Sequence, residues 1–566
     1  MTDLLHHAPA GKVLQNLSHG HTATSENVAA TSGDQLEVAE VKTRFDYLFS
    51  TITGDPEAHL PATDPAKVSA DLQKLGKLML EPGPGRGDPD PFQSGDGNST
   101  IPAVYTYLGQ FIDHDITART DRPNEVGNVT DQPVVPVDPV VVGTKVTNER
   151  EPALDLDSVY GDGPTLPGGP ETAAKDLYDG IKLKVGTIAL EGKPGQDPVI
   201  RGVRIPLHSD LERDLPRGVD GDPTKANIAD SRNDENLIVA QLHLAFLRFH
   251  NRTVDWVRKH EPYYTDRAVF ERARQLVTWH YQWLVVHDYL TTVALPGVVD
   301  DLLLHPDRRF DPRNGEVWMP LEFSVAAFRF GHTMVRGAYD YNRNFGRPSA
   351  SAPFFLLFAF TGGGGFFGQT DVLPFNWVIE WERFVEHDPR FPDHFSRKVD
   401  TRLADALGTM VNQTNEEEEA DPRIKEILEH LAVRNLLRGY QLSMPTGQAV
   451  AAQLSLAPLS EPEIQSGNSE ELNQHLADSG FLQKTPLWYY VLKEAEVQSQ
   501  GNALGELGSR IVAGTLIGQL RNDPTSYLNV GLEPWVPEKG VLLPNGRPIL
   551  TMKDFLRFAG VLPTRP

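Results

Sequence analysis

Five short segments of the 566-residue chain place ionisable or amide side chains inside otherwise apolar surroundings. In chain order they are "GQFIDHDIT" (109–117), "LDLDSVYGDG" (154–163), "IADSRNDENL" (228–237), "FRFGHTMV" (328–335) and "AVRNLLRGY" (432–440). Burying a charge is costly unless that charge has a partner. A lone histidine in an apolar helix is more often a core residue than a ligand, so the five segments carry weight only as a set.

Together the segments contain the groups that peroxide chemistry at a haem requires. Haem iron takes a neutral imidazole as ligand, and a hydrogen-bond acceptor on the other ring nitrogen makes that imidazole more electron-donating. Cleavage of a peroxide needs a second, unligated base on the opposite face and a cationic group beside it. Two histidines, several arginines and a mid-helix asparagine meet these needs.

The ordered set resembles the peroxidase–cyclooxygenase superfamily, the animal-type haem peroxidases that include myeloperoxidase, lactoperoxidase and bacterial relatives. The resemblance rests on "GQFIDHD", "SRNDE" and "FRFGHT" and extends from about residue 45 to the C-terminus. It implies that His114 is the distal base, with Gln110 one helical turn earlier holding distal water or a halide. It further implies that Arg232 is the distal arginine and that His332 ligates the iron, with Asn435 as the acceptor behind it.

The same resemblance implies how the haem, a haem b, is held at its rim. Arg438 would pair with a haem propionate, three residues after the asparagine on the same helix face. Asp113 and Glu235 match the two carboxylates that form ester bonds to haem methyl groups in the mammalian members. The residue after that glutamate is a methionine in myeloperoxidase, where it forms a third link through sulfur. Here it is Asn236, so this third link is impossible.

A calcium ion is the second cofactor that the resemblance implies. Asp115, next to the distal histidine, would ligate it together with the side chains of Asp155 and Asp157 and the carbonyl of Ala153. Glu151 stands where family members often have threonine. Calcium favours six to eight oxygen ligands with several carboxylates. Successive residues of a helix point about 100° apart, so Asp113, His114 and Asp115 can face the haem, the peroxide and the calcium ion.

The expected activity is reduction of hydrogen peroxide with oxidation of small aromatic donors, halides or thiocyanate. His114 would carry the proton between the peroxide oxygens, and Arg232 would stabilise the developing charge. The alternative within the superfamily is a fatty-acid dioxygenase, but such enzymes place a tyrosine three residues before the proximal histidine, and here that residue is Arg329. An inactive haem carrier has no need of both distal groups. A non-haem hydrolase would need clustered ligands such as HExxH, which the sequence lacks.

Composition agrees with an enzyme that acts on small molecules. The chain has 53 Lys and Arg against 77 Asp and Glu, a net charge of -24 that disfavours nucleic acids and anionic membrane surfaces as partners. It has no cysteine, which excludes disulfides and thiolate-bound metals. No run of about 18 apolar residues predicts a membrane span. The first residues lack the basic and apolar regions of a secretory signal, which favours a cytoplasmic protein or one exported by another route.

Helices must position these segments. Apolar residues recur at helical spacing over 235–260, 266–293, 321–339, 421–442, 485–497 and 506–523, and "IPAVYTYLGQ" (101–110) leads helically into the Asp-His-Asp triplet. The Pro-rich stretch 131–150 predicts a long covering loop. Residues 1–40 predict a polar arm, and residues 41–566 a single domain. The fold class expected is mainly α, a large helical haem-peroxidase domain with long covering loops and few short strands.

Overall fold

A computed structural model describes residues 43–81, 97–118, 126–166, 168–189, 210–310, 318–342, 345, 352–366, 370–385, 395–410, 413 and 416–563. The arm predicted for residues 1–40 lies outside these ranges. The helices are α1 Pro65–Leu78, α2 Val104–Ile116, α3 Pro139–Lys145, α4 Asp157–Tyr160, α5 Leu237–His260, α6 Asp266–Leu284, α7 Thr291–Val293, α8 Val298–Leu304, α9 Glu382–Val385, α10 Glu416–Glu419, α11 Pro422–Glu429, α12 Leu431–Gln441, α13 Gly447–Gln453, α14 Glu461–Gln465, α15 Glu470–Ser479, α16 Leu487–Ser499, α17 Glu506–Asn522 and α18 Met552–Ala559.

The strands are short, with two to five residues each. They are β1 Thr43–Asp46, β2 Asn98–Pro102, β3 Thr147–Asn148, β4 Tyr178–Asp179, β5 Lys182–Leu183, β6 Arg217–Val219, β7 Asp222–Ala226, β8 Trp318–Pro320, β9 Ala338–Tyr339, β10 Ala352–Pro353 and β11 Phe395–Arg397. Among the described residues the largest sheet has three strands in the order β3-β1-β8, and the other sheets are pairs. The prediction of a mainly helical fold with few short strands is therefore confirmed.

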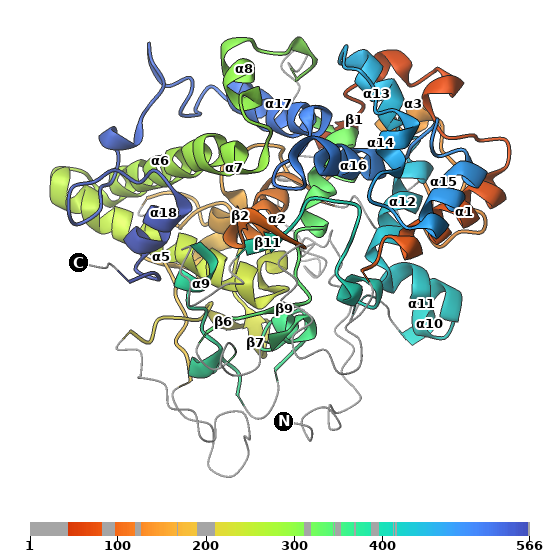
Figure 1. Ribbon diagram of the computed structural model, residues 1–566. Helices are drawn as coiled ribbons and strands as arrows, with labels where there is room; N and C mark the ends of the chain where they lie inside the picture. Colours follow the sequence, from red (N-terminus) through yellow and green to blue (C-terminus); the bar gives the residue numbers. More distant parts are fainter. Residues whose placement is uncertain are drawn as a thin grey trace, which may run out of the picture.

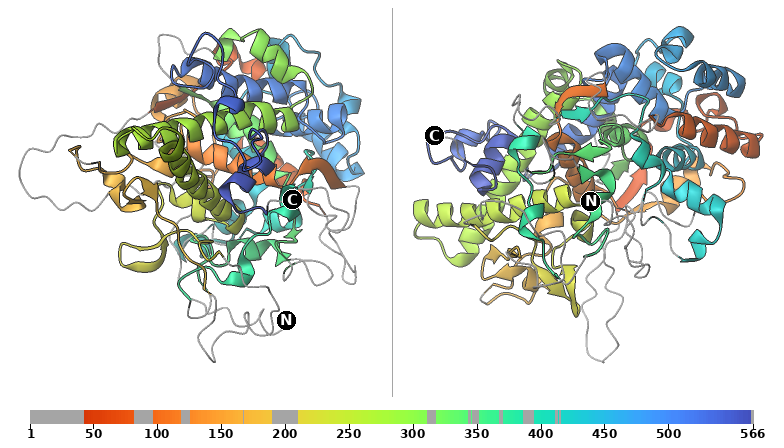
Figure 2. Two further views of the ribbon diagram at one scale, coloured as in Figure 1. Left: turned by 90° about the vertical axis from the view of Figure 1, so that its left-hand side faces the viewer. Right: turned by 60° about the horizontal axis from the view of Figure 1, so that its bottom comes forward.

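Two groups of helices enclose α2. The long helices α5 and α6 lie side by side on one side of the molecule, with α18 packed on α5 (Figure 1). On the other side α1 packs against α12 and α15, and α16 packs against α17 (Figures 1 and 2). Phe111 of α2 stacks on Phe246 of α5, with ring centroids 4.4 Å apart. One cluster of buried apolar side chains runs from Phe45 to Leu562 and connects both groups.

The segment that carries His332 departs from the regular helix predicted over 321–339. Residues Glu322–Ala326 form a π-helical turn, Ala327–His332 a 3₁₀-helix, and the chain then enters β9. Side chains take carbonyls that a regular helix would use: Arg329 Nε donates to the Ser324 carbonyl (3.0 Å) and Trp488 Nε1 to the Arg329 carbonyl (3.2 Å). These tertiary contacts, rather than the local pattern, set the backbone here.

The stretch 131–150 is more regular than the covering loop predicted for it. It contains the short helix α3, whose first residue is a proline that needs no backbone N–H partner there, and the edge strand β3. An edge position tolerates a proline-rich neighbourhood because only one side of the strand is paired. Within the described ranges, none of the helices combines the length and the apolar character that a membrane span requires.

Candidate active site

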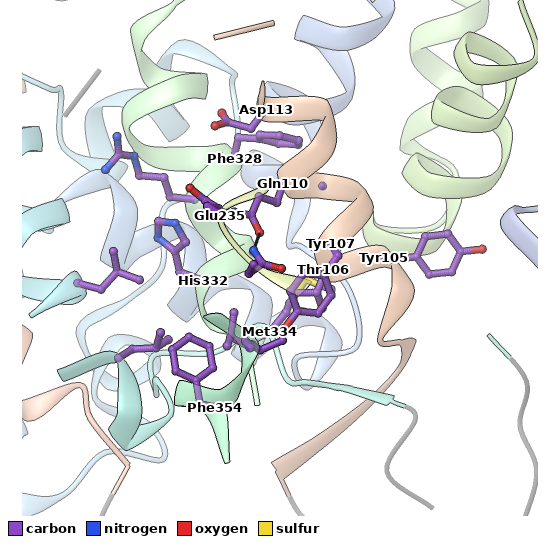
Figure 3. Close-up of a pocket in the computed structure, with 18 of the residues that line it drawn as sticks. Tyr105, Thr106, Tyr107, Gln110, Asp113, Glu235, Phe328, His332, Met334 and Phe354 are labelled. Carbon is purple, nitrogen blue, oxygen red and sulfur yellow. Dashed lines mark hydrogen bonds between the residues drawn. The ribbon is translucent and has the colours of Figure 1, made fainter. Parts of the chain in front are cut away.

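A cleft separates α2 from the 3₁₀-helix that ends at His332. One wall carries Gln110 and Asp113 of α2 together with Glu235. The other wall carries Arg329 and the half-buried His332. In Figure 3, Gln110 and Glu235 meet in the middle of the cleft, His332 lies opposite them, and Phe354 lies towards one end. The walls are called distal (Gln110 side) and proximal (His332 side) below.

The distal wall is built on the last turns of α2. Asp113 and His114 lie three and four residues after Gln110, so each occupies a position next to Gln110 on the helix surface. Asp113 faces the cleft, and its carboxylate accepts a hydrogen bond from the Thr117 hydroxyl (2.8 Å). His114 is fully buried directly behind this wall: its Nε2 lies 3.9 Å from Glu235 Oε1. Asp115 points to a third direction, described below.

Two histidines and an asparagine form a chain behind the cleft. Asn233 Oδ1 lies 2.9 Å from His114 Nδ1, and Asn233 Nδ2 lies 3.0 Å from Nδ1 of the buried His243. Burial lowers the pKa of His243 to about 4, so this ring is neutral at ordinary pH and accepts from the amide nitrogen. The amide oxygen therefore faces His114, whose Nδ1 carries the proton. His114 Nε2, the nitrogen nearest the cleft, is then the basic one.

Glu235 and its neighbour form a polar clasp with Gln110. Gln110 Nε2 donates to the Glu235 carboxyl, and Asn236 Nδ2 donates to Gln110 Oε1 (3.1 Å). Asn236 is also the N-cap of α5, where its side-chain oxygen accepts from the Val239 amide (3.0 Å). Burial raises the pKa of Glu235 to about 8, partly offset by the charge of Arg232. The carboxyl next to His114 thus holds a proton near neutral pH.

A glycine-rich loop, Thr361–Gly365, supports Glu235 from outside the cleft. The Thr361 hydroxyl donates to the Glu235 carbonyl (3.2 Å), and the Gly362 amide donates to the Asp234 carboxylate (2.9 Å). A side chain at Gly363 would collide with the Glu235 carbonyl oxygen. The loop needs glycine here so that its backbone can approach the distal segment.

Arg232 lies behind the distal wall and is not among the residues that line the cleft. Its guanidinium donates to the Asp230 carboxylate (2.7 Å) and to the carbonyls of His114 (2.7 Å) and Thr117 (2.8 Å). Helix ends leave carbonyls without intrahelical partners, and Arg232 satisfies two of them at the end of α2. This residue therefore fixes the helix that bears His114, and its predicted role towards peroxide stays a prediction.

On the proximal wall, Asn435 of α12 joins His332 to an arginine. Asn435 Nδ2 lies 2.9 Å from His332 Nδ1, and Asn435 Oδ1 accepts from Arg329 Nη1 (2.6 Å). The sequence predicted that the asparagine oxygen would accept from the histidine, but here Arg329 occupies that oxygen. Arg438, one turn later on α12, is buried and donates to Gln441 Oε1 (2.5 Å).

Three carboxylates meet on the side of α2 away from the cleft. One oxygen from each of Asp115, Asp155 and Asp157 lies within 4.8 Å of the others. Burial raises the pKa of Asp115 well above its ordinary value, and the charges of Asp157 and Asp155 raise it further. Such a group is stable as a charged cluster only with a cation among its oxygens. Burial raises the pKa of Asp155, and the exposed Glu151 acts in the same direction. The Ala153 amide donates to the Glu151 carbonyl (2.8 Å).

Sequence analysis assigned no role to four side chains that hydrogen-bond with predicted site residues or with their partners: Asn233, His243, Arg150 and Asp230. Asn233 stands within "SRNDEN", so its place next to two motif residues was a usable signal. His243 looks like any histidine in an apolar helix. Arg150 and Asp230 are 80 residues apart in the chain, and only the fold brings them together.

The fold and the cleft define a helical protein with His332 on one wall of a cleft and His114 buried behind the other wall. Residues 144–357 match the family model described as Animal haem peroxidase. Over this segment the chain is similar to the animal haem peroxidases, the family that its motifs resemble.

Known relatives agree with this assignment. The chain is 25% identical over 253 residues to peroxidase mlt-7 of Caenorhabditis elegans, a match that covers 41% of this chain and 32% of that protein. It spans a third or less of the length of the curated relatives it matches. Its fold is similar to peroxidase A of Dictyostelium discoideum (TM-score 0.54, 16% identity, 89% of this chain and 95% of that chain). It is also similar to a fatty acid alpha-dioxygenase of Arabidopsis thaliana (TM-score 0.51, 14% identity, 92% and 74%).

Proposed function

We propose that this protein binds haem b in the cleft and acts as a haem peroxidase that reduces hydrogen peroxide with electrons from small donors. The observation that carries the proposal is the pair of imidazoles, His332 on one wall and His114 behind the other. Each has its Nδ1 hydrogen-bonded to an asparagine, which orients the ring.

The donor set fits haem. His332 would hold the iron through Nε2, and Arg329, which lines the cleft, would pair with a propionate. Arg438 is buried and is not among the lining residues, so its predicted propionate contact stays a prediction. Asp113 and Glu235 face the cleft and are the groups available for ester bonds to the porphyrin rim. Bound haem would supply the redox-active iron at which peroxide is reduced. Asn435 would accept from His332 Nδ1 once Arg329 turns to a propionate, because the amide oxygen is then free to face the ring.

The chain's own groups handle the proton. His114 Nε2 would take a proton from the peroxide oxygen nearer His332 and return it to the outer oxygen, which leaves as water. The protonated carboxyl of Glu235, 3.9 Å from Nε2, lies between His114 and the cleft. Asn233 and His243 hold His114 in the tautomer that makes Nε2 the base, and Gln110 holds Glu235. Arg232 keeps the end of α2 in place.

Small neutral aromatic molecules are the donors that the cleft favours. Its wall is mostly apolar; the aliphatic and aromatic members include Phe328, Phe354, Leu357, Phe358, Met410 and Leu431. A net charge of -24 disfavours the approach of anions such as halides and thiocyanate. Phenols therefore fit better than anions, although both belong to the expected donor range. The Asp115–Asp155–Asp157 cluster is proposed to hold calcium.

Absorption spectroscopy followed by a donor screen tests the proposal. Purified protein supplied with haem should show a strong Soret band that changes on addition of peroxide and recovers with a phenol. Phenol should support faster recovery than bromide or thiocyanate at equal concentration. A protein that binds no haem, or binds it without responding to peroxide, would refute the proposal.

A fatty-acid dioxygenase is the second candidate, favoured by the apolar cleft and the fold likeness to the plant enzyme. Arg329 takes the place of the tyrosine expected in that class, which argues against it. Oxygen uptake with linoleate in the absence of peroxide separates the two activities. We expect none; rapid uptake would transfer the proposal to fatty-acid oxygenation.

A further inference from the structure

A continuous line of charged side chains connects the carboxylate cluster to the distal helix. Arg150 Nη1 donates to Asp157 Oδ2 (2.9 Å), and Arg150 Nη2 donates to Asp230 Oδ2 (2.5 Å). The same Asp230 oxygen accepts from Arg232 Nη2 (2.7 Å), which also donates to the His114 carbonyl (2.7 Å). Four contacts thus lead from a ligand of the proposed cation to the backbone of the proposed base.

Arg150, Asp230 and Arg232 form the middle of this line, and each is buried and hydrogen-bonded to the member on either side. Asp230 is 1% exposed, and although burial opposes its charged form, Arg232 and Arg150 hold its pKa well below the usual range. Asp230 is also the N-cap of the short helix Ser231–Asp234, where it accepts from the Arg232 amide (3.0 Å). Charge-assisted bonds of this kind are short and directional. A displacement of Arg150 therefore moves Asp230, Arg232 and the helix start together.

We propose that Arg150 is a positioning residue that carries cation occupancy at Asp115–Asp155–Asp157 to the segment 228–236 and thereby to His114. The inference rests on the cation site of the proposed function. Asp115 gives the cation one route to His114, through α2 itself. Arg150 gives a second route, which runs through a different segment and reaches α2 from the side of Arg232.

Physical reasoning favours an ordering effect of the cation. Without a cation, the three carboxylates repel one another, and Asp157 can be drawn away from its neighbours. A divalent cation fixes Asp157 between itself and Arg150, so that Arg150 keeps its second arm on Asp230. An arginine suits this role because its planar fork reaches two carboxylates at once, which the single ammonium of lysine cannot do as well.

Hydrogen exchange measured by mass spectrometry, with calcium added to or removed from haem-free protein, tests the two routes separately. In the wild type, calcium should slow exchange about fivefold or more in both segments, 110–118 and 228–236. In Arg150→Gln, protection by calcium should remain in 110–118 and be lost in 228–236. Arg150→Lys should keep an intermediate protection of 228–236, which guards against a glutamine variant that folds poorly.

Arg248→Gln is the matched control. Arg248 has the same 8% exposure as Arg150 and also pairs with an aspartate, Asp210 (2.6 Å), but it contacts neither the cluster nor α2. Its removal should leave both calcium responses intact. Calcium protection of 228–236 in Arg150→Gln equal to that in the wild type would overturn the role of Arg150 alone.

If calcium changes hydrogen exchange in neither segment of the wild type, both the proposed cation site and this inference are wrong. The Soret and peroxide test would still judge the haem peroxidase function independently. Calorimetric titration with calcium alone, on the wild type, Arg150→Gln and Arg248→Gln, identifies which of these cases applies. A variant that binds calcium and responds only in 110–118 is the expected result.

Discussion

The two walls of the cleft hold their histidines by the same contact but in opposite surroundings. On the distal side, His114 is fully buried in a regular helix, and its asparagine bridges to a second, neutral imidazole. On the proximal side, His332 is half-buried at the end of an irregular helix, and its asparagine bridges to a guanidinium. The same side chain therefore fixes opposite tautomers according to what lies on its far side.

This difference suits two different tasks. A base must be locked, since the wrong tautomer presents an N–H to the peroxide. A metal ligand can complete its arrangement when the metal arrives, because the bond to iron then selects the tautomer. The distal wall is correspondingly held in place by Asn233, Arg232 and the loop of Gly363. In the proposed function, the proximal wall completes its arrangement when Arg329 turns to a haem propionate.

The largest expected effects come from removing each imidazole. His332→Ala should lose haem or bind it very weakly, because it removes the ligand that we propose for the iron. His114→Ala should keep the Soret band but react with peroxide about 10²- to 10⁴-fold more slowly, the usual contribution of a positioned acid–base group. Haem titration and stopped-flow absorption measure the two quantities.

His250→Gln serves as the control for loss of a buried histidine. His250 contacts Tyr160 and the Ile181 carbonyl, remote from the cleft. It should change neither haem affinity nor the rate with peroxide. Unchanged haem binding in His332→Ala would show that His332 is not the iron ligand. The two walls would then not differ in the tasks proposed for them.

Exchanging each asparagine for leucine should have the next largest effects, and on different quantities. Asn233→Leu should slow the reaction with peroxide on the order of 10- to 100-fold at normal haem content, because His114 loses the partner that sets its tautomer. Asn435→Leu should weaken haem binding by a similar factor, as is usual for partners of metal-ligating histidines. Equal effects of both variants on haem affinity would show that the distal asparagine serves packing alone.

Sequence alone predicted most of the helices. Of the predicted site residues, Gln110, Asp113, Glu235 and His332 line one cleft, whereas Arg232 and Arg438 are not among its lining residues. The consecutive positions of Asp113, His114 and Asp115 were enough to predict that their side chains point in three directions, because helix geometry is local. The sequence could not predict the irregular helix before His332, because Trp488 and Arg329 take its carbonyls through tertiary contacts. The orientation of Asn435 was equally hidden, since it depends on Arg329 from another segment, and the Arg150–Asp230 pair exists only in the folded chain.

A smaller effect concerns the pH dependence of stability through Glu235. Its pKa is raised to about 8 in the folded protein against 4.5 for an ordinary glutamate, so between these values the folded state holds a proton that the unfolded state has lost. Stability must then fall as pH rises through this window. Between about pH 5.5 and 8.5, haem-free wild type should lose about 1–3 kcal/mol more unfolding free energy than Glu235→Gln.

Denaturant titrations at the two pH values provide the measurement, and haem-loaded protein sharpens it. If Glu235 forms an ester with haem, its charge disappears and the difference between the two proteins should vanish in the loaded form. Acid-acetone extraction, which leaves ester-bound haem on the protein, gives an independent answer. A difference of opposite sign in the haem-free proteins would mean that Glu235 is ionised behind the clasp.

The smallest expected effects compare one glycine from each side of the cleft. A Cβ at Gly363 would collide with the Glu235 carbonyl oxygen, so Gly363→Ala should destabilise the fold by about 1–3 kcal/mol. A Cβ at Gly331, beside His332, would meet nothing within 4 Å, so Gly331→Ala should be neutral or stabilising by up to about 1 kcal/mol. Thermal and denaturant unfolding of haem-free protein measure both. Because the added methyl group is the same, a loss of unfolding free energy in Gly363→Ala alone would show that the distal segment is the more closely supported. Equal losses in both variants would mean that the proximal wall is as closely packed as the distal one.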